Sequence, residues 1–575
     1  MKPLIFTAVL LVLLGCDSAS NDDASVTGPL PADLVLTGGN VITMDAQQSE
    51  AEAVAVRNGR IAAVGTAAEV AALISDATVV IDLEGRSLLP GFIEGHGHFL
   101  GLGDAQMILD LRSATSFEAI VDAVELAVAE SEPGIWILGR GWHQERFDPA
   151  PEEAYDGVPR HDALSAVSPE HPVLLTHASG HASFANALAL AEAAIDRDTP
   201  DPEGGTIVRD REGEPTGFLR QAAQMPVRRA AAAARESMSE AEQQARFLRQ
   251  VELASAEALR HGVTSFHDQG TRFADIERLK RLAEAGELPI RLHVAVRGES
   301  NADLDRRLPD YRMIGHGDNF LTVRSVKRAI DGALGTHGAW LLEPYSDKPD
   351  TSGLPQTSIE HLRETADIAA RHGFQLHVHA IGDRGNRETL DVFEAVFAEH
   401  GPEEDRRWRV EHAQNLHPDD IPRFMDLGVV ASMQGIHATS DGPWVPQRLG
   451  EARARERAYV WRSLLDADAI ICNGTDVPVE PISPIASLHA SVTREMANGE
   501  RFFPEQSMGR LEALWSYTVG CAFAGFTEDL VGTIAPGMLA DLVVLDGDPL
   551  TMPEDALRDL EVHMTLVGGE IRYRR

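Results

Sequence analysis

The chain has 575 residues, of which 43% are apolar and 24% charged, a composition that is ordinary for a globular protein and a length that suits more than one domain. The formal net charge of −38 argues against a nucleic-acid-binding protein, because a phosphate backbone requires a Lys/Arg patch. An acidic soluble surface explains this charge more simply than a cation-attracting funnel does.

The first 16 residues, MKPLIFTAVLLVLLGC, form a targeting segment with one cation, an apolar run and a small residue before Cys16. The run is too short to span a bilayer comfortably. Its end resembles the lipobox of bacterial lipoproteins, which implies cleavage before Cys16 and lipidation of its thiol. A plain secretory signal with a chance cysteine is the alternative.

Residues 17–31 are polar and predict a flexible tether. Asp17, directly after the cysteine, resembles an inner-membrane retention signal. We therefore expect an exported protein on the periplasmic side of the bacterial inner membrane, with the lipid anchor as its sole membrane contact.

The two ends of the remaining chain have the same sequence pattern. Residues 32–88 and 530–575 contain short β-rich runs separated by Gly, Asn and Asp turn signals. This pattern is typical of a small antiparallel sheet. We predict a small β-sandwich domain built from both chain ends.

Residues 89–529 alternate apolar strands with amphipathic helices, which predicts an α/β fold with a parallel sheet. Eight strands in this order close a (β/α)8 TIM barrel. The stretch between the first two strands is too long for one crossover helix, so a large insertion, about 104–255, is expected over the barrel's mouth. The predicted strands lie near 91–98, 262–268, 289–296, 321–329, 374–380, 407–413, 428–434 and 468–476.

Histidines lie at the ends of two of these strands. Side chains alternate along a strand, so His96 and His98 point the same way and can converge on one ion. His377 and His379 have the same spacing. His379 lies nearer the carboxyl end, where barrel enzymes keep their chemistry, and is the preferred ligand. His377 is then a deeper packing residue or a support for the ligands.

Two further strands end in metal-binding side chains, His412 in RWRVEHAQ and Asp476 in NGTD. A carboxylate beside an activated water can ligate the ion, accept the water's proton and pass it to the leaving amine, so Asp476 is the candidate catalytic residue. For an aspartate in GTD the alternative is a turn or a helix cap. The placement of all these residues at strand ends is what favours a hydrolytic metal site.

Lys327 is predicted to point into the barrel from the fourth strand. Desolvation favours its neutral amine, which can take up carbon dioxide to form a carbamate that bridges two cations. The alternative is a charged lysine paired with Asp331, four residues further on.

Cys472 and Cys521 are the remaining cysteines, and each lies in an apolar run. Buried free thiols are therefore favoured over a disulfide, although an exported protein could oxidise them.

The ordered motifs resemble those of the amidohydrolase superfamily, and within it the YtcJ-like branch that includes N-substituted formamide deformylase. The resemblance implies a divalent metal, with zinc favoured and one or two ions, and carbon dioxide for a carboxylated Lys327. It also implies His96, His98, His379, His412 and Asp476 as metal residues. The matching stretches cover nearly all the chain after the tether: LPGFIEGHGHF, GWHQERF, HASGHASFANALAL, VTSFHDQG, VKRAIDGALGTHGAWLLEPYSD, HVHAIGDRGN, VEHAQ, NGTDVPVEP and GTIAPGMLADLVVLDGDP.

In such relatives the insertion roofs the pocket, so four of its residues are candidate substrate contacts. His177, His181 and Asn186 come from HASGHASFAN, with ordinary loop packing as the alternative. Trp142 is a candidate pocket wall, although a buried core indole is the more common use.

We therefore predict an enzyme, a metal-dependent hydrolase that cleaves the amide C–N bond of a small N-acyl or N-formyl amine. One alternative is a cyclic amidine deaminase, whose relatives usually carry a Glu at the position of Gly382. A catalytically silent tethered binding protein is the other. No nucleic-acid partner is expected, and the oligomeric state, including a homodimer, stays open.

Overall fold

The computed structural model describes residues 30–575 except 150, 152, 156, 179–180, 203 and 402–404. The predicted lipoprotein signal, residues 1–16, and nearly all of the tether lie outside the described residues. Within the described part, no helix is both long enough and apolar enough to cross a membrane.

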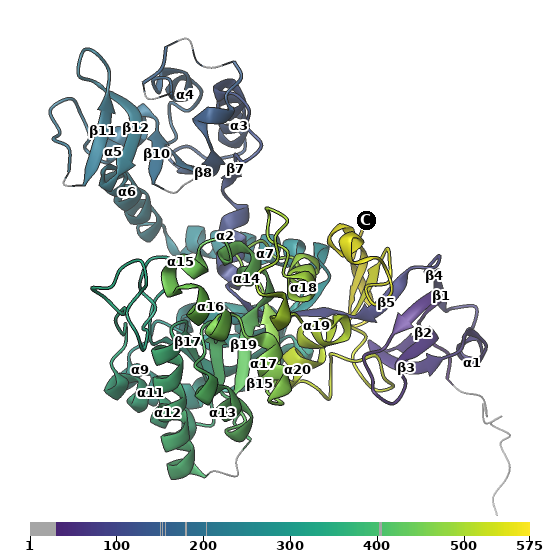
Figure 1. Ribbon diagram of the computed structural model, residues 1–575. Coiled ribbons are helices and arrows are strands. Elements are labelled where there is room, and N and C mark those ends of the chain that lie inside the picture. The colour runs from purple at the N-terminus through teal and green to yellow at the C-terminus, as the bar shows by residue number, and fades with distance from the viewer. Residues whose placement is uncertain are drawn as a thin grey trace, which may run out of the picture.

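The centre of the molecule is a barrel of eight parallel strands, each paired with the next along the chain (Figure 1). The backbone N–H of Asp476 donates to the carbonyl of His96 at 2.7 Å, and that of His98 donates to Val477 at 2.8 Å, so the last strand meets the first. The predicted TIM barrel is confirmed. Its strands are β6 (Phe92–Gly97), β13 (Val263–Thr271), β14 (Arg291–Val296), β16 (Leu321–Ala329), β17 (Gln375–Ala380), β18 (Arg409–His412), β19 (Val430–Gln434) and β20 (Ile471–Gly474).

The barrel strands are buried on both faces, as parallel strands covered by helices must be. Serine side chains begin several of the covering helices by accepting a backbone N–H, and Ser239 forms a capping box with Glu242. The helices that follow the strands include α7 (Glu240–Arg260), α8 (Phe273–Ala285), α9 (Asn301–Tyr311), α11 (Ile359–Arg371), α12 (Asp383–His400), α13 (Ile421–Asp426), α14 (Gly435–Asp441), α17 (Trp461–Asp466), α18 (Pro484–Thr493), α19 (Arg510–Tyr517) and α20 (Val519–Ala524).

Both chain ends contribute to one sheet of eight strands, as the sequence predicts, but the sheet is mixed and not purely antiparallel, because β1 pairs in parallel with β4 and β5. The C-terminal strands join it where β21 pairs antiparallel with β5. Only Gly91 separates β5 from β6, so this sheet is continuous with the first barrel strand. The strands are β1 (Leu34–Ile42), β2 (Glu50–Arg57), β3 (Arg60–Gly65), β4 (Val79–Asp82), β5 (Ser87–Pro90), β21 (Leu542–Leu545), β22 (Val562–Val567) and β23 (Glu570–Arg574).

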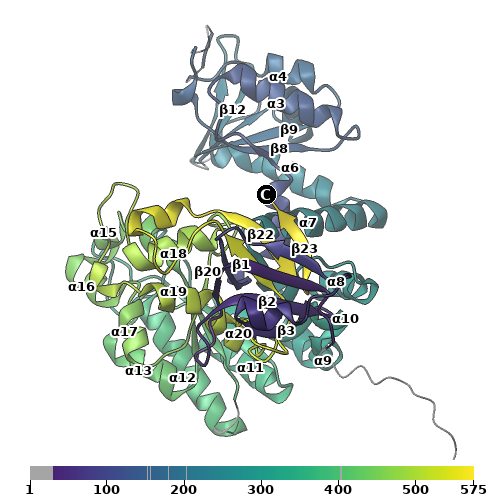
Figure 2. The same cartoon turned by 90° about the vertical axis from the view of Figure 1, so that its right-hand side faces the viewer.

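The insertion after β6 forms a second body with a six-stranded sheet and its own apolar clusters. It stands away from the barrel at the top of both views, linked to it through α2 and α6 (Figures 1 and 2). The close roof that the sequence predicts is therefore not formed in this arrangement, because the insertion packs around a core of its own. Its elements include β7 (Leu109–Asp110), α3 (Phe117–Ala129), β8 (Ile137–Trp142), α4 (Asp162–Val167), β9 (Val173–His177), β10 (Ala182–Ala185), α5 (Ala187–Glu192), β11 (Gly205–Arg209), β12 (Pro215–Gln221) and α6 (Met225–Glu236).

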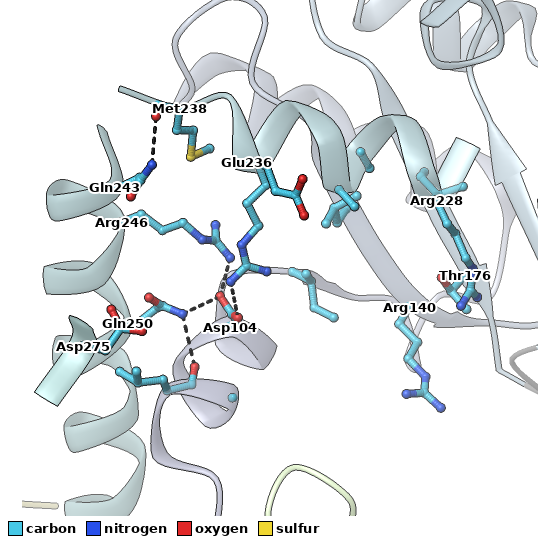
Figure 3. A pocket seen from close by; sticks show the side chains of 18 of the residues that line it. Asp104, Arg140, Thr176, Arg228, Glu236, Met238, Gln243, Arg246, Gln250 and Asp275 are labelled. Atoms are coloured by element: carbon cyan, nitrogen blue, oxygen red, sulfur yellow. Dashed lines mark hydrogen bonds and ion pairs between the residues drawn. The ribbon is translucent and has the colours of Figure 1, made fainter. Parts of the chain in front are cut away.

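A cavity of about 950 Å³ lies at the junction between the insertion and the barrel. Beside it, Asp104 of α2 (Phe99–Gln106) accepts hydrogen bonds from Arg235 of α6 at 2.7 Å and from Gln250 of α7 at 2.8 Å, and it also pairs with Arg246 (Figure 3). One carboxylate of α2 thus binds side chains of both α6 and α7.

Candidate metal centre

Three of the predicted ligands converge at the carboxyl end of the barrel. One ligand atom from each of His96, His412 and Asp476 lies within 4.8 Å of the others, and all three residues are buried. Asp476 Oδ1 is 3.4 Å from His96 Nε2 and 3.1 Å from His98 Nε2. Two imidazoles and a carboxylate at this spacing form a donor set that suits Zn²⁺ or a similar ion.

His379 lies beside this group. Its ring centroid is 4.5 Å from that of His412, and its Nε2 is buried with no hydrogen-bond partner among the described residues. Burial and the nearby Lys327 lower the pKa of His379 to about 3, so the imidazole is neutral and able to bind a metal.

Lys327 points into the same space from β16. Its side chain is buried, and its Nζ has no hydrogen-bond partner within the described part of the chain. Burial lowers the pKa of Lys327 to about 8. The alternative ion pair with Asp331 is not formed, because the Asp331 carboxylate accepts the backbone N–H groups of Trp340 and Gly382, both at 2.8 Å, and of Ile381 at 3.0 Å.

Hydrogen bonds fix the orientation of two of the histidines. His96 Nδ1 lies 2.5 Å from Glu411 Oε2, and His412 Nδ1 lies 2.7 Å from Gln434 Oε1. Both Nδ1 atoms must donate, because neither partner oxygen can. In the neutral form of each ring, Nε2 therefore carries the lone pair and faces the site, an arrangement that is typical of metal-ligating histidines.

The carboxylates of the site are charged. Although burial raises the pKa of Asp476, His96 and His98 hold it well below the usual range. Burial also raises the pKa of Glu411, but His96 and Lys327 outweigh this effect and lower it. Burial and Lys327 lower the pKa of His96, whereas Glu411 and Asp476 raise it above its ordinary value.

Two of the candidate ligands have strained backbone conformations. His412 has φ 75° and Asp476 has φ 56°, in the left-handed region that residues other than glycine seldom adopt. Such strain persists only where surrounding contacts impose it, and it is concentrated at functional sites.

Close packing explains two glycines of the motifs. A Cβ on Gly95 would collide with both Cys472 Sγ and the Asn473 carbonyl, and a Cβ on Gly474 would meet Glu94 and the His96 backbone. Larger residues at these positions would push β6 and β20 apart and separate His96 from Asp476.

Sequence reasoning missed four residues that support the site. Glu94, fully buried, accepts Thr475 N–H at 2.6 Å, and burial raises its pKa to about 8. Glu411 and Gln434 orient ligands, as described above. His437 of α14 stacks on His412 at 6.2 Å, and its buried Nε2 has no partner among the described residues. The same strand-end rule applied to the seventh strand would have found Gln434 and His437.

The deeper layer of the barrel contains His377, as predicted. Its ring nitrogens each lie 3.0 Å from a glutamine side-chain oxygen, those of Gln269 and Gln375. His377 therefore packs below the site and is not part of the ligand group.

The four candidate substrate residues lie in the insertion, and the structure gives two of them structural contacts. The Asn186 side chain caps α5 by accepting Ala189 N–H and also donates to Ser168 and His171. Trp142 is buried, and its Nε1 donates to the Leu175 carbonyl.

His177 and His181 also lie in the insertion. His177 Nε2 is 3.1 Å from Gln144 Oε1, and its ring packs against Trp142 and His143. His181 is exposed at the start of β10. A substrate role for all four residues stays a prediction.

The cysteine prediction is wrong. Cys472 and Cys521 form a disulfide, not two free thiols. The bond joins β20 to α20, at the side of the barrel where Asp476 follows β20. Apolar sequence surroundings indicated burial correctly but carried no information about which residues meet in space.

A divalent ion fits this group of residues. Lys327 Nζ and His379 Nε2 are buried close to each other, and neither has a hydrogen-bond partner among the described residues. Buried polar atoms normally have partners, so their convergence indicates a missing bound group.

The family model described as "Amidohydrolase family" matches residues 79–573. The chain is similar to YtcJ of Bacillus subtilis (strain 168), with 32% identity over 94% of this chain and 99% of that protein. It is similar to N-substituted formamide deformylase of Arthrobacter pascens, with 30% identity over 94% and 98%. The crystal structure of an uncharacterized metal-dependent hydrolase from Pyrococcus horikoshii OT3 superposes with a TM-score of 0.71 at 26% identity, over 91% of this chain and 99% of that one. With the fold, the strand-end ligands and these matches together, the chain belongs to the amidohydrolase family, in its YtcJ-like branch.

Proposed function

We propose that this metal-dependent hydrolase cleaves the amide C–N bond of a small N-acyl or N-formyl amine. The observation that carries the proposal is the buried group formed by His96, His412 and Asp476, with Lys327 unpartnered beside it. The similarity to N-substituted formamide deformylase over nearly the whole chain supports the choice of bond.

The four histidines and Asp476 would hold the ion, which would supply Lewis-acid polarisation of a carbonyl and a more acidic water. The residues provide the rest of the chemistry. The Asp476 carboxylate, which His96 and His98 keep charged, accepts the proton of the attacking water. It then delivers that proton to the departing amine nitrogen.

His437 is placed to stabilise the negative charge that develops on the substrate's carbonyl oxygen. Its unpartnered Nε2 lies beside the His412 ring, on the helix that directly follows β19. A hydrogen bond from this nitrogen to the substrate's carbonyl oxygen would strengthen as negative charge builds on that oxygen.

Lys327 is proposed to carry a carbamate formed from carbon dioxide. A neutral amine is required for this reaction, and burial lowers the pKa of Lys327 far enough to make that form accessible near neutral pH. The absence of any carboxylate partner for its Nζ among the described residues supports this assignment.

The alternative functions fit less well. At the position where the deaminase relatives usually carry a glutamate, Gly382 offers only its N–H, which donates to Asp331 at 2.8 Å. A binding protein without catalytic activity would not need buried side chains without partners or candidate ligands with strained backbone. In this chain, each predicted ligand position carries a residue type that can bind a metal.

We also propose that the protein is exported and held to a membrane by lipid on Cys16. The Cys472–Cys521 disulfide supports an oxidising compartment, because such bonds are rare in the cytosol. The proposed partners are a small amide substrate and, through the lipid anchor, the membrane. No nucleic-acid partner is proposed, and no oligomeric state is assigned, a homodimer included.

An activity screen over N-formyl and N-acyl amines tests the reaction. The metal-loaded protein should release free amine, and a chelator should abolish the release. Asp476→Asn should lose at least about 10²-fold in kcat when compared with the wild type at equal metal content, because the amide cannot accept the water's proton. Asp419→Asn, an exposed control, should behave like the wild type. Unchanged turnover in Asp476→Asn would contradict the assigned role.

A further inference from the structure

A second cavity lies at the amino end of the barrel, away from the metal centre. It has a volume of about 110 Å³ and opens between β13, β14 and β16 on one side and the segment after α20 on the other. Figure 1 marks this end of the barrel by the labels of β15 (Met313–Gly315) and α20. No metal-centre residue lines it; its polar lining includes Ser265, His267, His293, Thr322 and Arg324.

His293 is the central polar group of this cavity. It is 5% exposed, and neither of its ring nitrogens has a hydrogen-bond partner among the described residues. Burial and the cations Arg409 and Arg324 hold its pKa well below the usual value, so the ring is neutral. A neutral imidazole has one N–H to donate, and a buried donor without an acceptor indicates an absent ligand.

Arg324 is the second group without a partner. Its guanidinium lies 3.6 Å from the Phe526 ring centroid, yet within the described residues it forms no hydrogen bond or ion pair. Two carboxylates that act on it electrostatically, Asp405 and Glu528, are bound to Arg407 at 2.8 and 2.7 Å. Arg324 therefore has no ion pair of its own at the cavity within the described residues.

The remaining charges of the cavity wall do not supply a counter-ion. Arg291 also lines the cavity, but it is neutralised by a two-point contact with Asp541 at 2.6 and 3.0 Å. Behind His267, the buried Arg409 donates to its Nδ1 at 3.1 Å and adds further positive potential. A surplus of positive charge is unusual in a chain whose net charge is −38.

We propose that this cavity binds a small oxyanion, a carboxylate or phosphate group, between the Arg324 guanidinium, the His293 N–H and the Ser265 hydroxyl. The donors come from three neighbouring strands, because His267 pairs with His293 and His293 with Thr322 across the sheet. Guanidinium binds oxyanions through two parallel N–H groups, and the small volume limits the ligand to a few heavy atoms. The site does not depend on the proposed reaction.

Crystals of the metal-loaded protein soaked in selenate test the location directly. An anomalous selenium peak between Arg324 and His293 is the expected result. Density for water alone in this cavity, with selenium bound elsewhere, would overturn the proposal.

Calorimetric titration with inorganic phosphate, and separately with formate, tests the chemistry. Arg324→Gln should weaken binding about tenfold or more, because a charge-assisted hydrogen bond is lost. Arg363→Gln removes the same charge from an exposed helix and should leave binding unchanged. His293→Gln, which keeps a donor, should retain more affinity than His293→Leu.

The two anions and a chelator separate the sources of binding. Stronger binding of formate than of phosphate would assign a carboxylate ligand, and the reverse order a phosphate ligand. Anion binding that is lost on chelation but equal in wild type and Arg324→Gln belongs to the metal centre and contradicts the second site.

Discussion

The metal centre depends on side chains that burial leaves without partners. Lys327 is the clearest of them, because a buried amine with no hydrogen bond is costly unless the protein uses it. Its lowered pKa and its position beside His96 and His379 make it the residue whose removal should affect metal binding most directly.

Lys327→Ala should lose most of the bound divalent metal, and short carboxylic acids should restore part of it by replacing the bridging oxygens. Metal analysis by mass spectrometry measures both effects. Lys348→Ala, which removes an exposed lysine, is the matched control. Full metal content in Lys327→Ala would show that the amine does not bridge the ions.

The Lys327 amine should also make reactivation of the metal-free protein depend on pH. The pKa of Lys327 is about 8, so the neutral amine that reacts with carbon dioxide becomes more abundant as pH rises through that value. Reactivation of metal-free protein by zinc, at a fixed concentration of dissolved carbon dioxide, should therefore be faster one unit above this pKa than one unit below it. A rate that falls over this range would contradict carbamate formation.

Position at a strand end predicted which side chains gather at the carboxyl end of the barrel better than strand alternation does. In β18, alternation places Arg409 and Glu411 on one face and His412 on the other. His412 nevertheless reaches the site, because its φ of 75° turns the chain at the strand end. The strand-end position was enough to predict His412. Glu411 was missed, because the local sequence pattern does not show which residues a buried carboxylate will contact.

At the scale of elements, β18 and β19 orient the ligands that β6 and β18 provide. Glu411→Gln should weaken metal binding about 10- to 100-fold, because the negative charge that supports the His96 Nδ1–H is lost while the shape is kept. Metal competition with a chromophoric chelator measures the change. Glu399→Gln, at an exposed position, should have wild-type affinity. Equal affinity in both variants would mean that Glu411 only fills space.

The disulfide joins β20 to α20 across 49 residues. Closing a loop of that length stabilises the folded state by on the order of 4 kcal/mol in the chain-entropy model. The Cys472→Ser/Cys521→Ser double variant should therefore unfold at a lower urea concentration than the oxidised wild type. Reduced wild type is the control and should match the variant; equal midpoints for oxidised and reduced protein would show that no such bond forms.

The elements themselves were largely predictable. Buried parallel strands are read as short apolar runs bounded by turn residues, and all eight were placed within a few residues of their observed ends. The pairing of Cys472 with Cys521 and the placement of the insertion were not predictable. Both depend on contacts between distant segments, for which local periodicity carries no signal.

The whole molecule combines a barrel, a sheet built from both chain ends and an inserted body that stands apart from the barrel (Figure 2). The N-terminal sheet continues directly into the strand that ends in His96.

Cys16→Ser should move the protein from the membrane fraction to the soluble fraction, because a protein without acyl chains has no anchor. Fractionation followed by immunoblotting measures the distribution. Cys472→Ser is the matched cysteine control and should remain with the membrane. Persistent membrane association of Cys16→Ser would contradict lipidation.

The most direct test of the account is to locate the metal by anomalous scattering in crystals of the purified full-length protein. About one to two divalent ions per chain should be found among His96, His412 and Asp476, with His98 and His379 beside them. A protein that hydrolyses amides with no ion at this position, or with its ion bound elsewhere, would contradict it.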